Sequence, residues 1–141
     1  MQPAAFHHVA LNCRDPLAVE RFYVEHLGFE RARVIPLGTQ QIVFLRSGKV
    51  RLELFPAEGG VTDRPTDGDG PHGHGVRHLA FQVEDVDAKL AEMGEGAKVT
   101  LGPLSFDDFI PGWKTAWIAD PEGNVVEISQ GYADERAESR A

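Results

Sequence analysis

Cysteine and positive charge are both scarce in this chain of 141 residues, and each shortage excludes a class of protein. The single cysteine, Cys13, excludes the internal disulfide framework that small secreted domains use. Lys and Arg number 14 against 22 Asp and Glu, which gives a net charge of −8. Because phosphate contacts need clustered basic residues, this balance argues against nucleic acid as a partner.

Long apolar runs are missing as well. Runs such as residues 42–45 fall far short of the ~20 residues that cross a bilayer, so no membrane partner is expected. The first residues lack the basic and apolar stretches of a secretory signal. With 42% hydrophobic and 26% charged residues, the composition is that of a globular protein, and we expect it in the cytoplasm.

An internal repeat is visible along the chain. A predicted strand at 6–12 precedes a predicted helix at 16–27, and a strand at 76–83 precedes a helix at 86–93. Asp15 and Asp85 stand at the expected N-caps, and the strand segments HVAL and HLAF match residue for residue. Each helix is followed by three strand-like stretches: 29–36, 41–45 and 50–55, then 98–101, 115–119 and 125–129.

The repeat predicts an α+β fold made of two βαβββ modules in one domain. The modules cover about 5–56 and 76–131, and a linker rich in Gly, Asp and Pro (57–75) joins them. Asp120-Pro121-Glu122-Gly123 has the residue preferences of a type I turn between the last two strands. Residues 132–141 form a tail without an apolar pattern.

Alternation along the strands singles out four residues. Side chains in a strand point to opposite faces in turn, so large aliphatics such as Leu52 and Leu54 oppose Glu53. The same reasoning separates one His or Glu from the aliphatics in each of four strands, and these residues are His8, Glu53, His78 and Glu127. We therefore predict that they bind a metal.

Two imidazoles and two carboxylates favour a borderline divalent metal, namely Ni, Zn, Co, Mn or Fe(II). The simpler interpretation is that each His is a satisfied polar residue and each Glu faces solvent. The symmetric order of His then Glu, repeated in both modules, favours the metal.

The chain resembles the vicinal oxygen chelate superfamily, which includes glyoxalase I, extradiol dioxygenases and bleomycin-binding proteins. The resemblance extends from Phe6 to Gln130 and rests on the repeated His strands, on the segments FY and LGF around the first helix, on LELF, and on DPEGN running into VEI. It implies that the paired modules form an eight-stranded open barrel-like cup around a metal, in a homodimer.

By position, His8, Glu53, His78 and Glu127 match the four ligands of glyoxalase I. The resemblance therefore implies a metal-dependent lyase or isomerase that acts on a small oxygenated substrate through an enediolate. Glu127 is the first candidate for the base and Glu53 the second. Glutathione-using members have Arg and Asn where this chain has Asn12 and Ala57, which favours a different small-molecule substrate.

Two alternatives stay open at this point. An extradiol-type dioxygenase would need Fe(II) or Mn(II) and a coordination position open to oxygen. A non-catalytic drug- or metabolite-binding protein, like the bleomycin-resistance members, would bind a ligand without turnover.

Other residues carry weaker expectations. Residues 102–112 are predicted to form a loop over the mouth of the cup, with Phe106, Phe109 and Trp113 either as an apolar wall or packed on the core. His7 has the parity of the aliphatic face and is interpreted as structural, and Cys13 as a buried thiol. Tyr23 and Trp117 are predicted to belong to the core, and His72 and His74 offer a weak second metal site.

Overall fold

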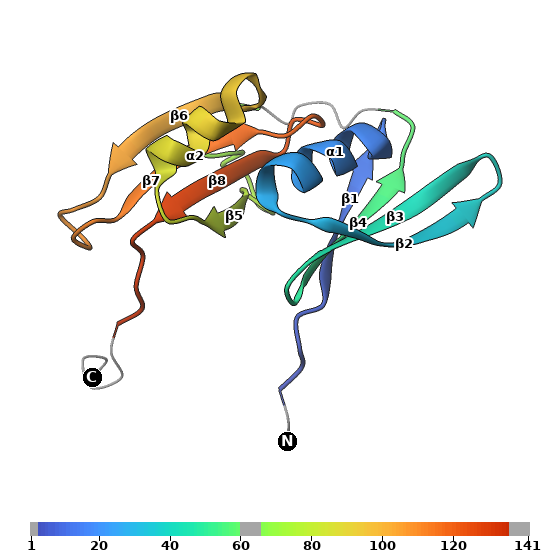
Figure 1. The fold of residues 1–141 in the computed structure, drawn as a ribbon, viewed down its shortest axis with the longest axis horizontal. Helices are drawn as coiled ribbons and strands as arrows, with labels where there is room; N and C mark the ends of the chain where they lie inside the picture. Colours follow the sequence, from blue (N-terminus) through green and yellow to red (C-terminus); the bar gives the residue numbers. More distant parts are fainter. Residues whose placement is uncertain (1–2, 60–65, 136–141) are drawn as a thin grey trace. The chain divides into compact units, whose positions relative to one another are not determined.

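The computed structural model describes residues 3–59 and 66–135, and the chain divides into two compact units, 1–63 and 64–141 (Figure 1). The first unit contains β1 (His8–Cys13), α1 (Pro16–Leu27), β2 (Glu30–Leu37), β3 (Gln40–Ser47) and β4 (Val50–Pro56). The second contains β5 (Leu79–Gln82), α2 (Val86–Met93), a short 3-10 turn (Gly94–Gly96), β6 (Lys98–Ser105), β7 (Lys114–Ala119) and β8 (Val125–Gln130). Within the described ranges, no helix is long and apolar enough to span a membrane.

The two sheets have the same topology. The strand orders are β1-β4-β3-β2 and β5-β8-β7-β6. In each sheet the first strand pairs with the last in parallel, and the remaining pairs are antiparallel. Each unit is therefore one βαβββ module whose first and last strands are neighbours, although they are far apart in sequence.

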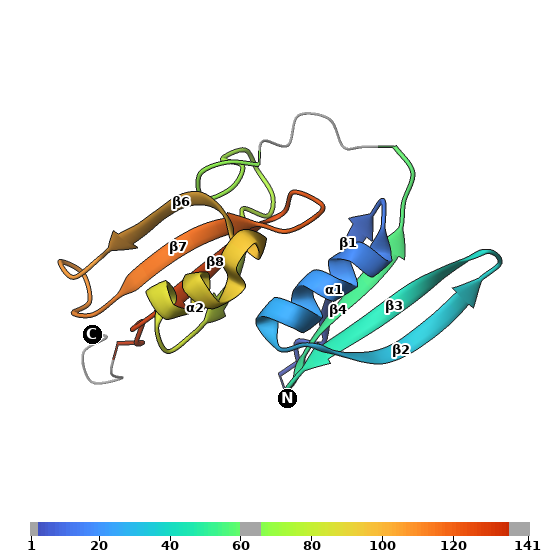
Figure 2. The same ribbon diagram turned by 45° about the horizontal axis from the view of Figure 1, so that its top comes forward.

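In the first unit, α1 covers one face of the sheet (Figure 2). Asp15 starts the helix by accepting a hydrogen bond from the Ala18 N–H at 3.2 Å, and Gly28 ends it in a left-handed conformation. The buried side chains that join helix and sheet are apolar: Val19, Phe22, Tyr23, Val43, Leu45, Leu52 and Leu54. Their removal from water holds the helix on this face and leaves the other face of the sheet for polar groups.

In the second unit, α2 lies on β7 and β8 (Figures 1 and 2). Asp85 caps the helix by accepting from the Ala88 N–H at 3.0 Å. The buried residues under it are Val86, Met93, Ala116, Ile118, Val126 and Ile128. The predicted turn after β7 is confirmed, because the Gly123 N–H donates to the Asp120 carbonyl at 2.9 Å.

The α+β class and the paired βαβββ modules are confirmed, and both helices begin and end where the sequence predicts. The eight described strands form two four-stranded sheets and no closed barrel. Some strand boundaries were wrong. The strands predicted from Phe6 and Val76 begin at His8 and Leu79, the strand predicted at 41–45 extends to Ser47, and residues 102–105 of the predicted loop belong to β6. Gly102 and Pro103 favour a loop, yet the strand continues through them because shifts in register absorb both residues.

Candidate functional site

In each unit, the sheet register places one Glu between an alanine on one neighbouring strand and an aromatic residue on the other. Glu53 on β4 is paired with Ala10 on β1 and with Phe44 on β3. Paired residues on adjacent strands share a face. This row therefore lies on the face opposite to α1, and His8 lies on the same face as Ala10, two residues before it.

The first candidate pair consists of His8 and Glu53. The Nε2 atom of His8 lies 3.1 Å from Oε1 of Glu53, and the two side chains are 35% and 14% exposed. Phe44 lies edge-on to the imidazole, with ring centroids 5.8 Å apart. The other imidazole nitrogen, Nδ1, is 2.8 Å from Nδ1 of His7. His7 is exposed, lies one residue before the start of β1 and contacts His8.

The second pair repeats this arrangement with His78 and Glu127. The Nε2 atom of His78 lies 2.9 Å from Oε1 of Glu127, and the side chains are 21% and 15% exposed. Glu127 is paired with Ala80 and with Trp117, as Glu53 is with Ala10 and Phe44. Each unit therefore brings together its predicted His and Glu beside an aromatic ring.

Trp117 has a place that the sequence did not reveal. It is buried, as predicted for a core residue, but it shares the face of Glu127, and its indole lies edge-on to His78 with centroids 6.3 Å apart. Only the register between β7 and β8 assigns Trp117 to this face, and alternation within one strand does not fix that register. The position of Phe44 beside Glu53 was not predicted for the same reason, because it depends on the register between β3 and β4.

The imidazole of His78 is held in one tautomer by the backbone. Its Nδ1 lies 2.6 Å from the carbonyl oxygen of Asp69. A carbonyl oxygen can only accept, so Nδ1 carries the hydrogen and donates it. In the neutral ring, Nε2 then has a free lone pair directed to Glu127, which is the arrangement that metal-binding histidines commonly show.

Asp69 belongs to a segment, residues 66–77, that hydrogen bonds connect to the rest of the second unit. The Thr66 hydroxyl donates to the Gly123 carbonyl at 2.9 Å, and the Thr100 hydroxyl donates to the Gly68 carbonyl at 2.7 Å. The Asp69 carboxylate contacts His72 at 2.9 Å and Arg77 at 3.1 Å. The hydrogen bond with His72 is the main cause that holds the pKa of Asp69 below its usual range, and the contact with Arg77 adds to it. Residues 66–75 of the predicted linker therefore belong to the folded second unit, next to His78, and residues 60–65 of that linker lie outside the described residues.

Gly70 allows this segment to close. Its φ is +110°, a conformation that L side chains rarely adopt, and a Cβ atom placed there would lie 1.9 Å from the carbonyl oxygen of Arg77. Residue 70 must therefore be glycine if the chain is to pass this close to Arg77. This close approach of Gly70 to Arg77 determines how the backbone runs from Asp69 to His78.

The chemistry of these pairs suits a cation. An imidazole nitrogen without a hydrogen and a carboxylate oxygen are both acceptors, so a proton or a metal ion has to lie between nitrogen and oxygen atoms that are 2.9–3.1 Å apart. Each unit contributes one such pair, and no group of three or more His, Cys, Asp or Glu side chains suited to a metal is found among residues 3–59 and 66–135. The donors of both pairs, two nitrogens and two oxygens, fit a borderline divalent metal.

A hollow of about 240 Å³ lies beside Glu127 in the second unit. Its walls come from β5, from β8 and from the segments that flank β7 and β8; they are Ala80, Phe81, Gln82, Trp113, Glu127, Ser129 and Tyr132. Of the three aromatic residues predicted to form an apolar wall or to pack on the core, Phe106 packs on Trp113 with centroids 5.0 Å apart, while Phe109 is 77% exposed. The predicted aromatic wall is therefore contributed by Trp113.

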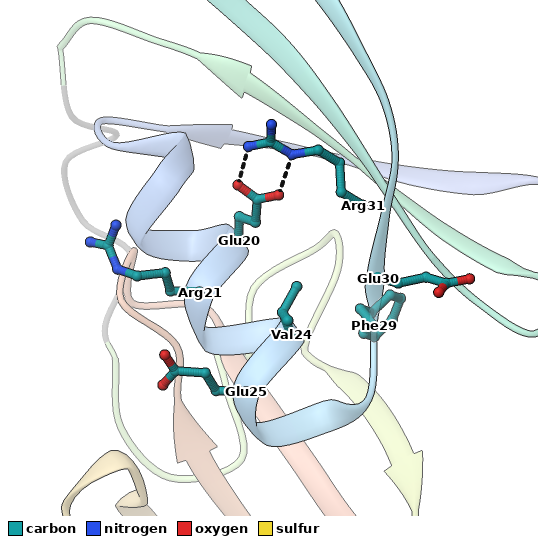
Figure 3. Close-up of a pocket in the computed structure, with 7 residues that line it drawn as sticks. All are labelled: Glu20, Arg21, Val24, Glu25, Phe29, Glu30 and Arg31. Carbon is teal, nitrogen blue, oxygen red and sulfur yellow. Dashed lines mark hydrogen bonds and ion pairs between the residues drawn. The ribbon is translucent and has the colours of Figure 1, made fainter.

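A second hollow, of about 320 Å³, lies between α1 and the start of β2 in the first unit. Figure 3 shows Val24 and Phe29 between helix and strand, with Glu20 and Arg31 joined above them by two hydrogen bonds, each 2.6 Å long. The bond to Glu20 raises the pKa of Arg31. This hollow is on the helix side of the sheet, away from Glu53, and has no part in the candidate site.

Comparison with known proteins shows which family the chain resembles. Residues 5–128 match the model of the Glyoxalase/Bleomycin resistance protein/Dioxygenase superfamily. The uncharacterized protein YwkD of Bacillus subtilis (strain 168) is 28% identical over 127 residues, which cover 88% of this chain and 94% of that protein.

Two solved structures give the same result. The glyoxalase family protein from Enterococcus faecalis is 32% identical, with a TM-score of 0.64 over 89% of this chain and 96% of that one. Lactoylglutathione lyase from Agrobacterium tumefaciens is 27% identical, with a TM-score of 0.59 over 93% of this chain and 96% of that one.

Proposed function

The chain belongs to the Glyoxalase/Bleomycin resistance protein/Dioxygenase superfamily, and from that premise we propose that it is a divalent-metal-dependent lyase or isomerase. In this proposal His8, Glu53, His78 and Glu127 are the ligands of one divalent transition metal, from the group Ni, Zn, Co, Mn and Fe(II). The substrate is a small oxygenated molecule, and the reaction moves a proton between adjacent carbons through an enediolate. We also propose that the protein acts as a homodimer.

One observation supports this proposal above the others. The Nδ1–H of His78 donates to the Asp69 carbonyl, so Nε2 is the nitrogen left to face a carboxylate oxygen 2.9 Å away. A surface ion pair would not require this backbone contact, whereas a metal ligand gains from it, because the ring is oriented before the metal binds. The same His–Glu pairing recurs at His8 and Glu53.

The chain's own groups supply the proton transfer. A metal bound at these residues would supply Lewis-acid polarisation of a substrate carbonyl. Glu127 is the proposed base: it is mostly buried, it lines the hollow of about 240 Å³, and its carboxylate can take a proton from one carbon and return it to the next. Glu53, which is 14% exposed, is the second candidate.

The first test is metal content by mass spectrometry on untagged protein. We expect about one transition metal per chain, and its loss in the His8→Ala/His78→Ala double variant. His26→Ala is the matched control: this histidine lies on α1, which covers the opposite face of the first sheet, so its removal leaves the metal in place. If the protein takes up no metal, even when Ni, Zn, Mn or Fe(II) is supplied, the proposal fails.

The second test separates binding from chemistry. Proton abstraction next to a carbonyl exchanges that proton with solvent, so deuterium should enter hydroxyacetone from D₂O in the presence of the metal-loaded protein. Glu127→Gln keeps the shape of the side chain, and we expect it to retain metal while slowing exchange at least about 100-fold. Full exchange in this variant would remove Glu127 as the base. Oxygen consumption with catechols and no exchange would indicate dioxygenase chemistry instead.

A further inference from the structure

The residues that line the hollow beside Glu127 determine which ligand groups can bind there. Three of its seven wall residues are aromatic, and Glu127 is the only charged one. The hydrogen bond from the Tyr132 hydroxyl to Asp134 raises the pKa of Tyr132, so the phenol stays uncharged. With no Lys or Arg in the wall, an anionic group has no partner there.

The aromatic wall is fixed by its own contacts. The indole Nε1–H of Trp113 donates to the hydroxyl of Ser129 at 3.2 Å, and the Tyr132 ring lies edge-on to the indole with centroids 5.8 Å apart. Gly131 brings Tyr132 to this place, because a Cβ atom at residue 131 would lie 2.3 Å from the Gly112 carbonyl. The ring faces are therefore positioned before a ligand arrives, which lowers the entropy cost of binding.

Position links the hollow to the proposed chemistry. Ser129 and Glu127 are two residues apart on β8, so both point to the same face, and Gln82 is paired with Ser129 on β5. A molecule whose oxygens lie at Glu127 therefore extends toward Trp113 and Tyr132. About 240 Å³ is less than the 300–1,000 Å³ typical of whole drug-sized ligands, so it accommodates one part of a substrate.

We propose that this hollow binds an uncharged aromatic group of the substrate, packed on Trp113 and Tyr132, while the oxygens of the same molecule lie at Glu127. This inference rests on the proposed function and narrows its substrate class to small oxygenated molecules that carry a neutral aromatic ring. A cationic ring would gain from the aromatic faces, but it would also lie next to the proposed divalent metal, whose charge repels it.

The hollow can be tested without metal, with benzamide and acetamide as probes. These amides differ only in the group that would enter the hollow. The chain has two Trp residues, so its ¹⁵N spectrum has two indole signals, which Trp113→Phe assigns. We expect benzamide to shift the Trp113 signal with a Kd at least about 10-fold lower than that of acetamide, because a ring is buried.

Variants locate the binding. Trp113→Ala and Tyr132→Ala should each raise the Kd of benzamide at least about 5-fold, read from amide signals of β8. Tyr132 is 49% exposed, so its variant keeps the fold even if the variant of Trp113 does not. Phe109→Ala is the matched control, because Phe109 lies on the same hairpin but outside the hollow, and it should leave the Kd within about 2-fold. No shift with benzamide, or equal binding of acetamide or benzoate, would overturn the inference.

A second pair of probes separates this inference from the proposed function. Benzohydroxamate and acetohydroxamate carry the same two chelating oxygens, one with a phenyl group and one with a methyl group. If neither binds better to zinc-loaded than to metal-free protein while benzamide still shifts Trp113, the metal proposal fails and the aromatic hollow stands. If both bind zinc-loaded protein equally and benzamide is without effect, the metal stands and the aromatic hollow fails.

Discussion

In the first unit the imidazole of His8 has a neighbouring side chain, His7, as its second partner, whereas in the second unit His78 has the carbonyl of Asp69. Either His7 or His8 can carry the proton that lies between their Nδ1 atoms, so the tautomer of His8 is left open. The carbonyl fixes the tautomer of His78. The same His, Glu and aromatic residue are thus repeated in two sheets of identical topology, but only the second copy is oriented by the backbone.

The surroundings of the two pairs differ in charge. In the first sheet the row that contains His8 continues through Arg51 on β4 and Arg46 on β3. The equivalent positions on β8 and β7 are Val125 and Ala119. The row of the first pair therefore carries two basic residues, whereas the equivalent row of the second pair carries none. The two units therefore share the candidate ligands and differ in the residues that lie beside them.

The largest expected effects are equal in the two units. Leu54→Ala and Ile128→Ala each remove a fully buried side chain beneath a helix, so each should lower the free energy of unfolding by about 2–5 kcal/mol. Urea denaturation measures this. Val50→Ala and Val99→Ala, at exposed positions of each unit, are the controls, with changes within about 0.5 kcal/mol. A loss below about 1 kcal/mol in one unit only would show that its core is less well packed.

The next effect is confined to the second unit. Gly70→Ala forces a side chain against the Arg77 carbonyl and should cost about 2–3 kcal/mol more than Gly75→Ala. Gly75 also has a positive φ, +125°, but open space around it, so it reports backbone strain alone. Equal losses in urea denaturation would contradict the close approach.

Metal affinity should separate the two pairs. Gly70→Ala disturbs the carbonyl that orients His78, so it should weaken metal binding about 10–100-fold. His7→Ala removes only an exposed and interchangeable partner of His8, and we expect a change below about 3-fold. Titration with a fluorescent zinc competitor measures both. The reverse order would mean that His7, and not the backbone at Asp69, provides the more important second contact.

The smallest effect concerns ion pairs outside the site. Glu20→Gln breaks a bidentate pair with Arg31, in which the Glu20 side chain is 13% exposed, and should cost about 0.5–1 kcal/mol. Asp87→Asn breaks the pair with Lys114 in the second unit, where Asp87 is 63% exposed, and should cost less than about 0.5 kcal/mol. Urea denaturation at low and high salt checks the difference, which should shrink as salt screens the charges.

Local patterns in the sequence determined much of this protein. Alternation in single strands placed His8, Glu53, His78 and Glu127 opposite the aliphatic residues, and the capping residues Asp15 and Asp85 set the beginnings of both helices. The repeat predicted two βαβββ modules. Each of these inferences depends only on neighbours along the chain, whose spacing fixes which side chains share a face.

Tertiary structure decided what surrounds the predicted residues. Register between strands placed Phe44 and Trp117 beside the two pairs, and a segment that sequence composition marked as a linker supplied the carbonyl that fixes His78. Trp113 and Tyr132 line one hollow, although they are 19 positions apart in the sequence. Such contacts join residues distant in sequence, so they depend on how the strands pair and how closely the loops pack, which no local pattern specifies.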